Sequence, residues 1–168
     1  SRIREHPTSA NFSRFTPEYS TTFHISWNYE GEDKSFWIKV LKKQREYLED
    51  KQAAGFFPEY FIKILYCLCH MEREMGNLDE AMQCADAGLR AVYHLNLYTQ
   101  WGALLFEKFR IVEDLKSGKG MEEKDFRLIR QAYAVERLFL KSEMGCKMIE
   151  DYLDERYRQD ELADMKRK

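Results

Sequence analysis

Four cysteines and a histidine–glutamate pair are the residues of this sequence whose types could support metal or redox chemistry. Cys67 and Cys69 lie two apart on an expected helix, where side chains at that spacing point to different sides, and no second Cys or His pair follows at zinc-ligand spacing. His70 and Glu74 lie four apart, as two helical ligands can, but a metal needs further ligands that the sequence does not place. We therefore expect no metal and no cofactor, with Cys67, Cys69, Cys84 and Cys146 in the core of a cytoplasmic protein.

Catalysis receives no better support from the pattern. Cys67 or Cys69 beside His70 would give a nucleophile and a base, but neighbours on a helix diverge, and no orienting acid or oxyanion donor is evident. The run Lys116-Ser117-Gly118-Lys119-Gly120 does not match the phosphate-binding loop G-x-x-x-x-G-K-[ST], so we interpret it as a turn. The chain is expected not to be an enzyme.

Composition narrows the class of protein. With 27 Lys+Arg against 29 Asp+Glu among 168 residues, the chain lacks the basic excess typical of nucleic-acid and membrane-surface proteins. Only 8 Gly and 3 Pro accompany 14% aromatic residues, which favours a helical domain with a bulky core over a linker or a fibre. The longest apolar stretch, residues 61–71, contains Lys63 and His70 and is far shorter than the ~20 residues of a membrane span. No partnership with a membrane is expected.

Apolar periodicity and helix signals predict an all-α fold of about seven helices over residues 17–158. The first helix would start at Thr16-Pro17-Glu18, although residues 20–27 also alternate like a strand. The others are expected near residues 33–54, 58–75, 78–93, 97–115, 121–141 and 145–158, after a linker or arm over 1–16 and before a charged tail over 159–168. Tail and arm contribute nothing to the expected core.

The expected core is a set of apolar stripes with three- and four-residue spacing. Its members are Phe36, Trp37, Val40, Leu41, Tyr47 and Leu48; Phe61, Ile64, Leu65, Leu68, Met71 and Met75; Ala81, Met82, Ala85, Gly88, Leu89 and Val92; and Trp101, Leu104, Leu105, Phe109, Val112 and Leu115. The small residues Ala81, Ala85 and Gly88 would let a neighbouring helix approach closely. Asn77 is expected to cap the helix that follows it, with Glu80 three residues on.

One helix pair has the length of a known repeat. The pair over residues 58–93 and the next helix start near Leu97 give a unit close to the ~34 residues of a tetratricopeptide repeat. Leu65-x2-Leu68-x7-Gly76-Asn77-Leu78-Asp79-Glu80-Ala81-x6-Gly88-Leu89 resembles that repeat, although Glu72, Ala85 and Tyr93 depart from its usual residues. The resemblance implies antiparallel helix pairs stacked into a short right-handed superhelix.

A wider resemblance covers residues 31–157, including the closing Met144-Gly145-Cys146-Lys147-Met148-Ile149-x2-Tyr152-Leu153-x3-Tyr157. Their order is similar to the C-terminal half of bacterial helix-turn-helix (XRE-type) transcriptional regulators, among them peptide-sensing regulators of Gram-positive bacteria. That resemblance implies a homodimer that binds a short peptide or protein segment in a concave groove. DNA binding would belong to an N-terminal helix-turn-helix outside this chain, an expectation with which the Ser1 start agrees.

In such repeats the first helix of each pair lines the groove. On the helix over 58–75 the face opposite the apolar stripe carries Lys63, Tyr66, His70 and Arg73, which share one side and could hold a peptide through stacking, hydrogen bonds and carboxylate pairing. The matching face over 97–115 offers Gln100, Glu107 and Arg110, and His24 and Trp27 are candidates earlier in the chain. The competing interpretation is an ordinary solvated face.

These patterns lead to two functional hypotheses. The first is a ligand-sensing and dimerisation domain of a transcriptional regulator. The alternative is a free-standing helical-repeat adaptor for protein–protein interaction that uses the same groove.

Overall fold

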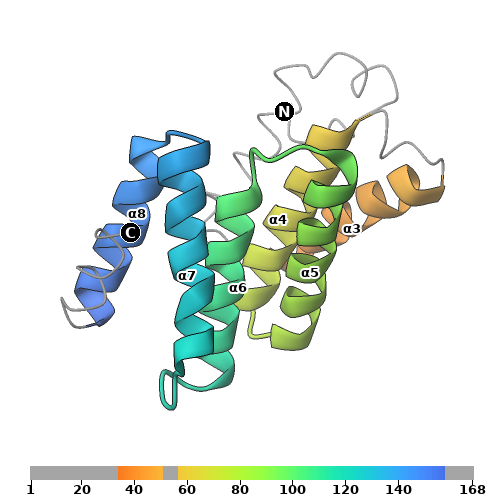
Figure 1. The fold of residues 1–168 in the computed structure, drawn as a ribbon. Helices are drawn as coiled ribbons and strands as arrows, with labels where there is room; N and C mark the ends of the chain where they lie inside the picture. Colours follow the sequence, from red (N-terminus) through yellow and green to blue (C-terminus); the bar gives the residue numbers. More distant parts are fainter. Residues whose placement is uncertain (1–33, 51–56, 158–168) are drawn as a thin grey trace. The chain divides into compact units, whose positions relative to one another are not determined.

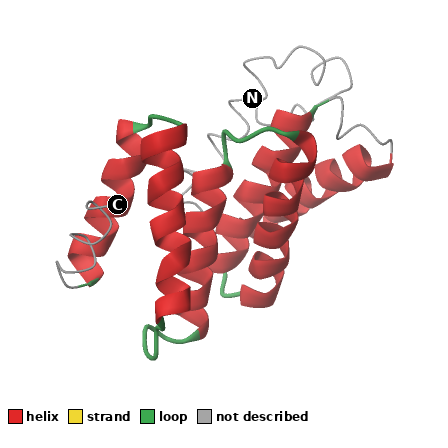
Figure 2. Ribbon diagram, viewed as in Figure 1, coloured by secondary structure: helices red, strands yellow, loops and turns green. Residues whose placement is uncertain are grey.

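Every regular element that the structure describes is a helix. The computed structural model describes residues 34–50 and 57–157, and within these ranges it contains no strand (Figure 2). The elements are α3 (Lys34–Asp50), α4 (Pro58–Glu74), α5 (Leu78–Leu95), α6 (Trp101–Leu115), α7 (Glu123–Ala134), the π-helical segment η3 (Val135–Phe139) and α8 (Glu143–Arg156). The all-helical prediction is confirmed for this part of the chain, which has six α-helices where about seven were predicted for the domain. The helix predicted at Thr16-Pro17-Glu18, residues 1–16 and residues 159–168 lie outside the described residues.

The chain divides into two compact units, residues 1–87 and 88–168, with the division inside α5. In the first unit, α3 packs against α4 (Figure 1). Side chains with no exposed surface come from three helices, and besides Cys69 of α4 they are Leu41 and Leu48 of α3, Ile64, Leu65 and Leu68 of α4, and Ala81 and Ala85 of α5. These seven were all predicted from helical spacing.

The turn between α4 and α5 follows from one glycine. Gly76 has a φ of +82°, a left-handed conformation that glycine adopts without the steric cost that other residues bear. The Asn77 amide donates to the Glu72 carbonyl at 2.9 Å and the Gly76 amide to the Arg73 carbonyl at 3.0 Å, so carbonyls at the end of α4 are satisfied. The chain reverses here and α5 begins at Leu78, as the sequence predicted (Figure 1).

In the second unit, α6 lies beside α7, and α8 packs against both (Figure 1). Its core joins Phe109 of α6, Ile129 of α7, and Ile149 and Leu153 of α8, all at most 2% exposed. Gly88 provides the predicted close approach, because a Cβ built there would lie 2.8 Å from a methyl carbon of Leu104. None of the helices described combines the length and apolarity needed to cross a membrane.

Four residues predicted for the apolar stripes are exposed instead. Phe36, Tyr47, Met75 and Leu115 are 40–52% exposed. Met75 and Leu115 occupy the last positions of their stripes, where the helix gives way to a turn. Phe36 lies near the first turn of α3 and packs its ring edge-on against Trp37, at 5.3 Å between ring centroids. Three of these errors therefore fall at the ends of stripes, whereas Tyr47 is exposed between the buried Leu41 and Leu48.

Two helix boundaries also differ from the prediction. Helix α6 begins at Trp101 and not near Leu97, because α5 continues to Leu95 and Asn96 then adopts a positive φ of 52°. The Leu97 amide donates to the Val92 carbonyl at 3.1 Å, which closes the C-terminus of α5. The helix predicted over 121–141 ends as an α-helix at Ala134 and continues as η3.

Candidate functional site

The predicted groove face of α4 is partly covered. Lys63, Tyr66 and Arg73 are intermediate in exposure, and His70 is 8% exposed. Their three- and four-residue spacing on a regular α-helix places them on one side. This face thus carries an aromatic ring, an imidazole and two cations, and its role in binding stays a prediction.

His70 is held by Glu74, one helical turn away. Its Nε2 lies 2.8 Å from Glu74 Oε1, and the other carboxylate oxygen of Glu74 forms an ion pair with Lys34 of α3. The two residues that were weighed as metal ligands therefore interact with each other and with a cation. Among the described residues no group of three or more His, Cys, Asp or Glu side chains is arranged to hold a metal ion.

A buried carboxylate lies at the end of α4. Glu72 is 1% exposed, its Oε1 lies 3.2 Å from Lys42 Nζ of α3, and its Oε2 accepts a hydrogen bond from the Asn77 side-chain amide at 2.7 Å. A buried carboxylate is expensive unless it is paired, and both oxygens of Glu72 have a partner. Asn77, which was predicted to cap α5, thus uses its amide to tie the turn to α4.

The three predicted groove residues of α6 differ in their surroundings. Gln100 is the N-cap residue and has intermediate exposure, whereas Glu107 is 2% exposed and lies 3.4 Å from Arg110 Nη1. The Arg110 guanidinium lies over the rings of Phe106 and Tyr152, at 5.6 and 5.2 Å from their centroids. Arg110 therefore takes part in packing between α6 and α8, with Glu107 as its ion-pair partner. Of the predicted groove residues, those of α4 belong to the first unit and those of α6 to the second.

The two earlier candidates, His24 and Trp27, lie outside the described residues. The predicted groove residues that the structure describes therefore all lie on α4 and α6 or at the N-cap of α6.

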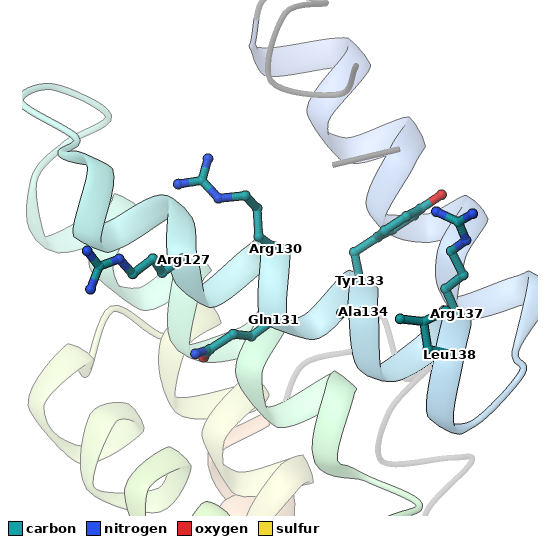
Figure 3. Close-up of a pocket in the computed structure, with 7 residues that line it drawn as sticks. All are labelled: Arg127, Arg130, Gln131, Tyr133, Ala134, Arg137 and Leu138. Atoms are coloured by element: carbon teal, nitrogen blue, oxygen red, sulfur yellow. The ribbon is translucent and has the colours of Figure 1, made fainter. Parts of the chain in front are cut away.

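A hollow along α7 and η3 carries three arginines that the sequence analysis did not single out. It has a volume of about 230 Å³. Figure 3 shows its lining residues, Arg127, Arg130, Gln131, Tyr133, Ala134, Arg137 and Leu138. The Tyr133 hydroxyl donates to Glu150 of α8 at 2.6 Å, and burial with this hydrogen bond raises the pKa of Tyr133 to about 12. The three- and four-residue spacing that puts residues on one helix face was visible in the sequence at Arg127, Arg130, Ala134 and Arg137. It was interpreted only as part of a helix.

The π-helical segment supplies two of the residues that line this hollow, Arg137 and Leu138. The Leu140 amide donates to the Val135 carbonyl, five residues back, at 2.8 Å. This wider turn leaves Val135 and Glu136 buried and three successive residues, Arg137, Leu138 and Phe139, exposed. π-helical turns occur frequently at functional sites.

Glu136 of the π-helical segment packs its buried side chain against α6 and α8. Its carboxylate lies between two glycines: a Cβ built on Gly102 of α6 would be 2.5 Å from Oε1, and a Cβ built on Gly145 of α8 would be 2.5 Å from Oε2. Burial raises the pKa of Glu136, and a hydrogen bond from the Ser142 side chain partly opposes that rise. Only residues without a side chain leave room for this carboxylate, so the glycines and Glu136 must be considered together.

The cysteines have the environment of core residues. Cys67, Cys69 and Cys84 are buried, Cys146 is intermediate, and no two of these four described residues are joined by a disulfide. Burial raises the pKa of the Cys84 and Cys146 thiols, so both stay protonated and weakly nucleophilic at neutral pH. The prediction that these side chains lie in the core is thus confirmed for three of the four.

No protein-family model, no curated protein and no solved structure matches this chain. Its function is therefore inferred from its own residues.

Proposed function

We propose that this chain is the ligand-sensing and dimerisation domain of a cytoplasmic transcriptional regulator, built as a short tetratricopeptide-like superhelix that binds a peptide or protein segment. The DNA-binding helix-turn-helix would belong to a segment outside this chain. The observation that carries the proposal is the α4–α5 pair, which has the Gly76 turn and the fully buried Ala81 and Ala85 that the repeat requires.

The polar face of α4 supports binding of an extended segment. Tyr66 can stack on a side chain, and Lys63 and Arg73 can pair with carboxylates. All three keep part of their surface accessible. Because His70 interacts with Glu74, its ring would keep one orientation beside the bound peptide. A peptide held by such side-chain contacts can lie extended along the helix.

An adaptor without any link to DNA is the second candidate function. An exposed aromatic cluster in the second unit favours it: Phe139, 56% exposed, contacts Tyr98 and Trp101 at 5.3 and 5.8 Å between ring centroids, and Tyr93, 57% exposed, contacts Trp101. Exposed apolar patches of this kind mark surfaces that a protein partner covers. The same fold would then recruit a protein without acting on transcription.

Selection from a displayed library of random dodecapeptides, followed by calorimetric titration of the selected peptides, tests the binding claim. Tyr66→Ala and Arg73→Ala should each weaken binding about tenfold, the loss expected for one strong contact. Arg90→Ala, at an exposed position of α5, is the matched control and should leave the affinity unchanged. Selected peptides that bind the wild type and the two α4 variants equally well would contradict the proposal.

The intact mass of the native gene product distinguishes the two candidates. A regulator would be several kilodaltons heavier than residues 1–168, with the excess at the N-terminus. A mass equal to this chain with an initiator Met would leave the adaptor as the better account.

A further inference from the structure

We propose that the hollow on α7 and η3 is a second binding site, which takes an extended acidic peptide segment independently of the α4 face. The segment would place carboxylates on Arg127, Arg130 and Arg137 and one apolar side chain in the hollow between them.

The arginines determine the charge of the occupant. Arginine presents a planar fork of donors that matches a carboxylate, and Arg130 already forms an ion pair with one, that of Glu123 at the start of α7. The Glu123 side chain is 71% exposed and that of Arg130 is 14% exposed, so an incoming carboxylate would reach Arg130 by displacing Glu123. Within the part of the chain described, Arg127 has neither an ion pair nor a hydrogen bond. A cation in that position is available to a ligand.

The arrangement of the guanidinium groups determines the shape of the occupant. In Figure 3, Arg127 points toward the start of α7, whereas Arg130 and Arg137 point to the same side of the helix, so the three do not converge on one point. Ten residues separate Arg127 from Arg137, which is about 15 Å of helix at ~1.5 Å per residue. An extended peptide covers that length in about five residues at ~3.3 Å each. A single phosphate or sulfate could contact one or two of these groups but not all three.

The lining of the hollow favours a peptide over a small molecule or a nucleic acid. Its volume of about 230 Å³ suits one or two side chains and is below the ~300 Å³ from which pockets for drug-sized ligands start. Ala134 and Leu138 give the hollow an apolar part, as Figure 3 shows. Single-stranded nucleic acid is held by stacking on accessible rings. The one ring in the lining, that of Tyr133, is 6% exposed, so its face is not accessible for stacking.

Fluorescence anisotropy with a labelled Glu-Asp-Leu-Glu-Asp peptide tests this site, with Gln-Asn-Leu-Gln-Asn as the neutral control. We expect the acidic peptide to bind and the neutral one to bind at least tenfold more weakly. Arg127→Ala and Arg137→Ala should each weaken binding about tenfold. Glu123→Gln should strengthen it severalfold, because the internal carboxylate that competes for Arg130 loses its charge.

Two variants provide the controls. Lys124→Ala removes an exposed cation of the same helix that does not line the hollow and should not change the affinity. Tyr66→Ala should also leave it unchanged, which separates this site from the α4 face. Equal binding of the neutral peptide, equal losses in Lys124→Ala and Arg127→Ala, or no binding at millimolar peptide would each overturn the proposal. Tighter binding of an oligothymidylate or of inorganic phosphate than of the acidic peptide would overturn it as well.

Discussion

The two cationic faces of the molecule, on α4 and on α7–η3, are built in different ways. On α4 the polar residues follow the regular helical period, and His70 is fixed by Glu74, which also holds Lys34. On α7–η3 the period is broken by a π-helical turn, and three successive residues after Glu136 are exposed. A regular face can be found by counting residues, whereas a face made by a helix irregularity depends on the contacts that hold the irregularity in place.

The largest effect that we expect comes from the glycines around Glu136. Alanine is normally favoured over glycine within a helix by up to about 1 kcal/mol, yet a Cβ on Gly145 would meet the Glu136 carboxylate at 2.5 Å. A Cβ built on Gly102 would lie equally close to the other carboxylate oxygen, so the Glu136 carboxylate is enclosed between the two glycines and has little room to move away. Gly145→Ala should therefore lower the free energy of unfolding by about 2 kcal/mol, the cost of overpacking, measured by urea denaturation.

The control for this prediction is the same substitution in a Glu136→Ala background. There the Cβ meets no carboxylate, so Gly145→Ala should become neutral or stabilising. The same loss in both backgrounds would show that Glu136 does not require the glycine.

A smaller effect is expected from Glu113, a buried carboxylate of α6 whose donors are neutral. Glu113 is 5% exposed and accepts hydrogen bonds from the Tyr152 and Tyr157 hydroxyls. Tyr157→Phe removes one donor and should lower the free energy of unfolding by about 1 kcal/mol near pH 8, measured by urea denaturation.

The matched control is Tyr93→Phe, which removes a hydroxyl from an exposed tyrosine of α5 and keeps the ring that packs against Trp101. It should leave the free energy of unfolding unchanged. Equal effects of Tyr93→Phe and Tyr157→Phe would show that the hydrogen bond to Glu113 contributes nothing.

The same tyrosines predict how stability changes at high pH. Burial, followed by hydrogen bonding to Glu113, raises the pKa of Tyr152 and of Tyr157. In the unfolded chain these phenols ionise near pH ~10, whereas in the folded chain they stay protonated to higher pH. The unfolded state therefore binds fewer protons above about pH 10, and stability falls as the pH rises through that range. Wild type should lose more stability than Tyr157→Phe between about pH 9 and pH 11; equal losses would contradict this assignment.

The smallest effect is expected at Lys34, the α3 cation that pairs with Glu74. Both side chains are 30% exposed, and pairs of this kind contribute little. Lys34→Ala should change the free energy of unfolding by less than about 1 kcal/mol. Thermal denaturation of this variant checks the prediction. Lys147→Ala, which removes a cation whose side chain is 75% exposed, is the comparison. A loss as large as that of Gly145→Ala would mean that the α4 face depends on its ion pairs as strongly as η3 depends on Glu136.

These comparisons show which parts of the fold could be predicted. Helical spacing identified the interiors of the stripes, such as Leu65 and Phe109, and the Gly76 turn, because each depends on residues close in sequence. The buried carboxylates could not be found that way. Glu113 meets Tyr152, 39 residues later, and a charged residue viewed alone is assigned to solvent.

The two candidate sites also differ in whether the sequence could predict them. The four residues on α4 were predicted to share a face, and they lie on a regular helix. The hollow on α7–η3 was missed, because two of its lining residues, Arg137 and Leu138, lie on a π-helical turn that residue spacing does not reveal. Residue spacing therefore predicted the shared face on α4, where the helix is regular, and missed the one that includes the π-helical turn.

Backbone amide mapping by NMR during titration with a selected library peptide tests the central claim most directly. The account predicts that the largest shifts occur at residues 63–73 of α4 and disappear in Tyr66→Ala. Shifts confined to other helices, with residues 63–73 unchanged at saturating peptide, would contradict it.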